Sequence, residues 1–113
     1  MSDTFFVSLS MNEAAKMIHK GVVEGSITGE LIDSHSVSSP DGCAVVVMVF
    51  EKHYYRAGNR LTLTVTLDNF SEKTRVHTVS GGGGEGLFRF DWGAAESFAQ
   101  VAKDVLSMYV ISK

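Results

Sequence analysis

The residues whose types and spacing could best support binding or catalysis lie between Ser80 and Phe98. Four consecutive glycines there precede the only tryptophan of the chain. The stretch Gly81 to Gly86 satisfies the pattern G-x-G-x-x-G, which binds dinucleotides only between a strand and an immediately following helix, with a parallel strand beyond. Here the predicted helix begins several residues late, and Glu85 would repel a phosphate. The glycines therefore predict a flexible or tightly bent connection, with an anion-binding or small-ligand site as the alternative.

The ligand hypothesis groups eight residues into one candidate site: Gly81, Gly82, Gly83, Gly84, Phe88, Phe90, Trp92 and Phe98. Its aromatic members would line a cavity between a curved sheet and the C-terminal helix. Trp92 fits a simpler role as a packing anchor at the start of that helix. No catalytic residue can be assigned, because the nearby Glu96 is explained as a partner of the helix dipole.

The spacing of the histidines and the position of the cysteine do not specifically indicate a metal site or a catalytic nucleophile. None of the four histidines forms an i, i+4 pair on a helix or an H-x-H pair on a strand. Asp33 and His35 share a strand face, and His77 could join them from a neighbouring strand, which leaves a metal site as an alternative. We assign no metal and no cofactor. Cys43, the single cysteine, is expected to be a small buried hydrophobe.

The N-terminal half predicts a strand, a helix and a hairpin. Thr4 to Leu9 alternates as a half-buried strand, and Ser10 to Glu13 reads as a capping box that starts a helix. The helix should end at Gly25 in a left-handed conformation. Ile27 to Val37 predicts a second strand with a bulge or at a sheet edge, and the turn at Ser38 to Gly42 should close a hairpin.

Cys43 to Glu51 is apolar on both parities and rich in β-branched residues, which is typical of a strand covered on both faces. Two helices can easily cover only one face of a small sheet. The other face must be closed by curvature, by a ligand or by another subunit.

The C-terminal half predicts two further strands and a helix. Leucine or valine alternates with threonine from Arg60 to Asp68, and another strand follows at Thr74 to Ser80. Leu87 to Phe90 can form a short last strand, and a helix runs from Trp92 to about Tyr109. We predict one α+β domain over residues 1–113: an antiparallel sheet of about five to six strands with two helices on one face, in the order β-α-β-β-β-β-(β)-α.

Composition and net charge limit the partners and the cellular location that we expect. The net charge of −3 argues against a nucleic-acid partner, which usually requires a basic surface. The single cysteine, the lack of a signal-peptide pattern and the absence of a long apolar run predict a cytoplasmic protein with no membrane segment.

Short motifs spread along the chain resemble those of a bacterial family of small stand-alone proteins of unknown function. They are Gly58-Asn59-Arg60, Ser80-Gly81-Gly82 and Trp92-Gly93 leading into Glu96-Ser97-Phe98. The resemblance implies a single α+β domain and no catalytic residue. At the level of fold alone, the chain is also similar to helix-grip ligand-binding domains.

We therefore expect a non-enzymatic domain that self-associates or binds a partner, most simply as a homodimer. The alternative is a small-molecule binding domain for an apolar or anionic ligand, and an enzyme is the third interpretation.

Overall fold

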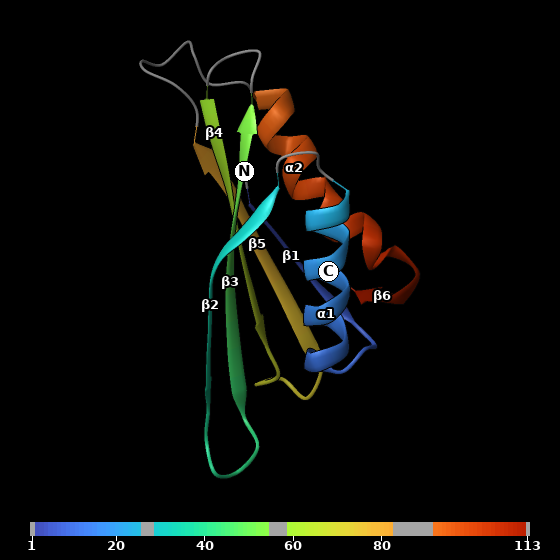
Figure 1. The fold of residues 1–113 in the computed structure, drawn as a ribbon. Helices are drawn as coiled ribbons and strands as arrows, with labels where there is room; N and C mark the ends of the chain where they lie inside the picture. The colour runs from blue at the N-terminus through green and yellow to red at the C-terminus, as the bar shows by residue number, and fades with distance from the viewer. Residues whose placement is uncertain (1, 26–28, 55–58, 83–91, 113) are drawn as a thin grey trace.

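The computed structural model describes residues 2–25, 29–54, 59–82 and 92–112 of the chain (Figure 1). Its strands are β1 (Ser2–Val7), β2 (Glu30–Ser38), β3 (Ala44–Tyr54), β4 (Asn59–Asp68), β5 (Thr74–Gly82) and β6 (Val110–Ser112). Its helices are α1 (Met11–Glu24), α2 (Trp92–Val105) and the short 3₁₀ helix η2 (Ser107–Tyr109).

The strands form one antiparallel sheet in the order β2-β3-β4-β5-β1-β6. The N-terminal strand β1 therefore lies between β5 and β6 rather than beside β2. Both α1 and α2 pack on the same face of the sheet, and the β2–β3 hairpin extends past the first turn of α1 (Figure 1). The predicted α+β class, the antiparallel sheet and the placement of both helices on one face are confirmed.

The first turn of α1 is built as the sequence predicts. The Ser10 hydroxyl accepts a hydrogen bond from the backbone N–H of Glu13 at 3.2 Å, and the Glu13 carboxylate accepts one from the Ser10 N–H at 3.2 Å. These reciprocal bonds satisfy two of the N–H groups that a helix start leaves without partners. The apolar stripe then turns Ala14, Ile18 and Val22 onto the sheet, where all three are fully buried.

The left-handed conformation predicted for Gly25 is wrong. Gly25 adopts φ −82° and ψ −4°, and its N–H donates to the Gly21 carbonyl at 2.8 Å, so the chain is still helical there. A β carbon at position 25 would lie 2.5 Å from that same carbonyl oxygen. The glycine is thus explained by a close backbone approach and not by a positive φ.

A second close approach involves Gly21 itself, which the sequence shows only as a poor helix former. A β carbon at this position would lie 2.2 Å from Cγ1 of Val105 on α2. Gly21 therefore lies at a close contact between α1 and α2, where a side chain would not fit without a shift.

The strand β4 gives the sheet its two different faces. Leu61, Leu63, Val65 and Leu67 are fully buried against the helices, whereas the threonines between them keep part of their surface in solvent. Phe98, Ala102 and Leu106 close the core from the α2 side. Fully burying one such leucine or phenylalanine contributes roughly 1.5–3 kcal/mol to stability.

The C-terminal end differs from the prediction. A helix to Tyr109 was expected from the apolar spacing, but α2 ends at Val105 and the chain then pairs with β1 as β6. The Ser8 N–H donates to the Tyr109 carbonyl at 2.9 Å, which draws the chain into the sheet. The β-branched residues Val110 and Ile111 suit that extended conformation. The strand predicted at residues 87–90 lies outside the described residues.

Candidate functional site

The face of the sheet opposite the helices carries the second apolar side of β3. Met48 and Phe50 point into the core and are 3% and 0% exposed. Val45, Val47 and Val49 alternate with them and are only half-buried. Among the described residues no helix packs on this side, so these three valines remain partly in contact with water (Figure 1). We refer to this side as the helix-free face.

Neighbouring strands add further apolar groups to the same surface. Val37 on β2 pairs with Val45 and is 58% exposed, and Val79 on β5 pairs with Thr64 and is 43% exposed. Ile32 on β2 is 49% exposed. Ile32 and Val37 lie on the edge strand β2, whereas Val79 lies three strands away on β5, so these exposed apolar side chains are spread across the sheet.

An ion pair fixes the polar part of the helix-free face. Arg75 Nε lies 2.9 Å from Asp68 Oδ2 and its Nη2 lies 3.1 Å from Oδ1, which is a two-point contact between neighbouring strands. Asp68 is 6% exposed and also accepts from the Phe70 N–H at 3.2 Å. The hydrogen bonds to Asp68, and then its negative charge, raise the pKa of Arg75 above its ordinary value. The two-point contact therefore ties β4 to β5 on this face.

The structure does not assemble the alternative metal site. Asp33 and His35 lie on β2, but His77 lies on β5, and β3 and β4 separate those strands. Three strand spacings amount to about 14 Å, which is too far for one ion. His77 instead shares a 2.7 Å hydrogen bond with the Thr4 hydroxyl. No group of three or more possible metal ligands occurs in the described part of the chain.

The free edge of β2 is a second surface feature. β2 occupies one margin of the sheet, where β3 is its only neighbour among the described strands (Figure 1). Almost all of its residues are exposed. A bulge shifts the register between Leu31 and Asp33. Both features that the sequence suggested for this strand, a bulge and an edge position, are therefore present.

Asn69 holds the β2–β3 hairpin against the β4–β5 turn. Its Oδ1 accepts from the Ala44 N–H at 2.8 Å, and its Nδ2 donates to the Gly42 carbonyl at 3.1 Å. Gly42 has φ +96°, which a residue with a side chain rarely adopts. The predicted turn is thus confirmed, and a side chain distant in the sequence anchors it.

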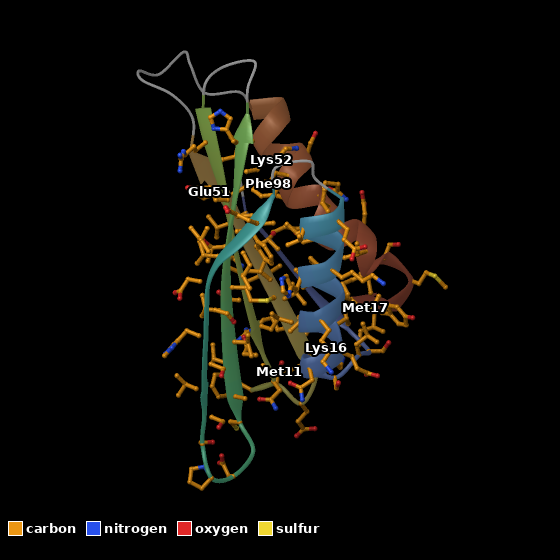
Figure 2. All side chains as sticks on the ribbon, viewed as in Figure 1. Met11, Lys16, Met17, Glu51, Lys52 and Phe98 are labelled. Carbon is orange, nitrogen blue, oxygen red and sulfur yellow. The ribbon has the colours of Figure 1, made fainter. Side chains whose placement is uncertain are left out.

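A groove lies between the hairpin and the start of α1, with a volume of about 870 Å³. One wall is the connection from β1 to α1 with Met11, which Figure 2 places at the lower end of the helix. The other walls are the β4–β5 turn and the helix-side residues Ser34, Ser36, Ser38 and Val46 of β2 and β3. Sequence reasoning missed this groove, although the alternating serines were visible.

The glycine-rich candidate site falls largely outside the described residues. Gly81 and Gly82 end β5, where they pair with Thr62 and Leu61 of β4. Gly83, Gly84, Phe88 and Phe90 lie outside the described residues, as does the side chain of Trp92. The predicted ligand site therefore stays a prediction.

Phe98 is the one aromatic member of that site whose side chain is described. It is 1% exposed and packs in the core, and the ammonium of Lys52 lies 5.9 Å from its ring centre (Figure 2).

The fold and these surfaces define a small α+β protein in which the described helices cover one side of the sheet. Neither α-helix in the described ranges combines the length and the apolar composition of a membrane span. The chain belongs to the family of unknown function DUF6054, whose model matches residues 3–110. The resemblance to a family of unknown function is thus confirmed. No curated protein and no solved structure matches the chain.

Proposed function

We propose that this protein is a non-enzymatic binding domain that acts as a homodimer. The proposed contact is the uncovered sheet surface, by which we mean the helix-free face together with the free edge of β2. This surface would bring the half-buried valines out of water.

The observation that supports the proposal is the unequal covering of β3. Met48 and Phe50 are enclosed, while Val45, Val47 and Val49 keep part of their area in solvent. A strand that is apolar on both parities normally has protein on both faces. A second copy of the same chain would cover this face without the need for a different partner protein.

The free energy gained by covering the exposed valines sets the affinity that we expect for the dimer. Covering the exposed part of Val37, 58%, or of Val79, 43%, contributes about 1–2 kcal/mol for each side chain. Because association itself costs several kcal/mol, a contact of this size requires hydrogen bonds as well as apolar burial. We expect dissociation constants on the order of micromolar, as for small interfaces.

Sedimentation velocity over a range of protein concentrations tests the proposal. The mass should rise from 12.3 kDa toward twice that value as the concentration passes through about 1–100 μM. Val37→Lys should shift the curve to higher concentration. Ser97→Lys adds the same charge on the exposed side of α2 and is the matched control. A mass of 12.3 kDa throughout would rule the homodimer out.

A second candidate function is the binding of a small apolar or anionic ligand, and the groove of about 870 Å³ supports it. Its walls combine the serine hydroxyls of β2 with the apolar Met11 and Val46. A ligand that binds the folded state should raise the melting temperature. A thermal-shift screen of lipids, nucleotides and aromatic acids should then give a hit that Val46→Trp, which fills the groove, abolishes. A screen without hits would remove this candidate.

A further inference from the structure

We propose that two copies of the chain pair through the free edge of β2, antiparallel and centred on Ser36, to form one continuous sheet. This inference rests on the proposed self-association and names the strand and the register of the edge contact, which covers Val37 of β2 and leaves Val45, Val47 and Val49 of β3 on the open face. The two β2 strands would then lie side by side in the middle of the joint sheet, related by a two-fold axis.

The hairpin fixes which backbone groups of β2 point outward. The Ser39 N–H donates to the Cys43 carbonyl at 2.8 Å, so these two residues form a hydrogen-bonded pair. Hydrogen-bonded and non-hydrogen-bonded pairs alternate along an antiparallel ladder. Residues 33, 35 and 37 therefore bond to β3, whereas the N–H and C=O groups of Ser34, Ser36 and Ser38 face the free edge.

Little in the strand protects this edge from pairing. Edge strands are usually blunted by lysine, proline, bulges or short length. β2 spans nine residues without a lysine or a proline, and its blunting features, the bulge at Leu31 to Asp33 and the carboxylates of Glu30 and Asp33, all lie in its first half. The regular part, residues 33–38, remains exposed. At the opposite margin β6 has only three residues.

Hydrogen bonding and charge select the register. With the axis at Ser36, residues 34, 36 and 38 meet residues 38, 36 and 34 of the second copy, so every outward group of the regular segment is used. Asp33 then lies opposite Ser39 of the second copy and not directly opposite a carboxylate, although the Ser39 hydroxyl donates to the neighbouring Asp41. A two-fold axis at His35 would place two imidazole rings opposite each other. A two-fold axis at Ser34 would extend the hydrogen-bonded pairing of the two β2 strands across the bulge.

The same register covers an exposed apolar side chain. His35 lies opposite Val37 of the second copy in a non-hydrogen-bonded pair, where α carbons are only about 4.5 Å apart. Because the contact is isologous, it occurs twice. Each Val37, 58% exposed in the single copy, would lie beneath an imidazole ring.

A cross-linking experiment tests the register directly. Ser36→Cys, combined with Cys43→Ser to remove the native thiol, places two α carbons about 5.5 Å apart across the axis, within the span of a disulfide. Mild oxidation should convert most of the protein into a covalent dimer. Ser38→Cys in the same background is the control, because its two thiols lie four residues apart along the strand, about 14 Å. Equal cross-linking of both variants would overturn the register.

A proline substitution tests the edge itself. Ser36→Pro removes an N–H that faces the free edge and makes no backbone bond to the described residues, and prolines are accepted on edge strands. It should raise the dissociation constant at least about tenfold, because two hydrogen bonds across the axis are lost. Ser36→Ala keeps the amide, and comparing the two variants isolates its effect. Circular dichroism and the melting temperature verify that both variants fold.

The outcomes separate the two proposals. A wild-type protein that is monomeric at every concentration removes the self-association on which the edge pairing depends. A wild-type dimer that persists in a folded Ser36→Pro variant, without cross-linking of Ser36→Cys, overturns the edge pairing alone and points to stacking of the helix-free faces. Loss of the dimer together with selective cross-linking supports the edge.

Discussion

Replacing Gly21 with alanine should destabilise the protein, although the same change strengthens most helices. An alanine β carbon would lie 2.2 Å from Cγ1, 3.1 Å from Cβ and 3.2 Å from Cγ2 of Val105. Carbon atoms in ordinary contact are about 3.5–4.0 Å apart. Because Cβ itself is among the close atoms, rotating the valine side chain does not remove the overlap. The two helices must therefore move apart.

The expected magnitude follows from two opposing effects. Alanine in place of glycine inside a helix contributes about 1 kcal/mol to stability. Forcing an extra carbon into a packed contact costs about 1–3 kcal/mol. The net change in the free energy of unfolding should thus be a loss of up to about 2 kcal/mol, with α2 displaced from α1.

Urea unfolding followed by circular dichroism measures this change. The companion variant Val105→Ala removes the two γ carbons, and the double variant Gly21→Ala with Val105→Ala should recover part of the loss. We expect a favourable coupling energy of about 1–2 kcal/mol between the two positions. If Gly21→Ala alone stabilised the protein by the full helix-propensity gain, our account of the contact would be refuted.

Three further predictions concern the sheet and its turns. Asp68→Asn should cost about 1–3 kcal/mol of unfolding free energy, because it weakens a two-point ion pair whose carboxylate is buried and whose guanidinium is partly exposed. Asn69→Ala should cost about 1–2 kcal/mol and speed hydrogen exchange at the Ala44 amide, which loses its acceptor. The Ser39 hydroxyl bond, followed by the Cys43 amide, lowers the pKa of Asp41 below its ordinary value of 3.8, so Ser39→Ala should raise that pKa in an NMR titration. Since the folded-state pKa is lowered, the contribution of Asp41 to stability is present above about pH 3.8 and is lost as the pH falls through the lowered value.

Controls keep these predictions specific. Glu51→Gln removes the exposed ion pair with Arg60, 3.0 Å long, and should change stability by less than about 1 kcal/mol. An Asp68→Asn variant that cost no more than this control would contradict the importance of the buried pair. Unchanged exchange at Ala44 in Asn69→Ala, or an unchanged Asp41 titration in Ser39→Ala, would contradict the other two.

Local chemistry made much of the fold predictable. The capping box at Ser10 depends on residues three apart, and the two faces of β4 depend on a period of two, so short stretches of sequence specify both. The order of strands could not be predicted, because pairing of β1 with β5 and β6 depends on contacts between distant segments. The end of α2 was missed because Leu106 and Tyr109 continue the apolar spacing of the helix, whereas the chain leaves the α-helix after Val105 and enters the sheet as β6. Gly21 shows its role only once Val105 is beside it.

The candidate surfaces were predictable to different degrees. The two-sided apolar pattern of β3 pointed to a face that helices would not cover, and Val45, Val47 and Val49 lie on that face. The groove could not be predicted, because three segments far apart in the sequence form it. Its depth depends on how far the hairpin extends beyond α1, which Asn69 helps to set by bonding Ala44 and Gly42.

The division of labour within β4 has a practical consequence for anyone redesigning this protein. At Leu61, Leu63, Val65 and Leu67 a library would return only compact apolar residues, since each side chain is sealed from water. Thr62, Thr64 and Thr66 alternate with these residues and keep part of their surface in solvent, so the fold constrains the choice of side chain there far less. New binding residues can therefore be introduced at alternate positions of β4, while the buried positions between them keep the fold intact.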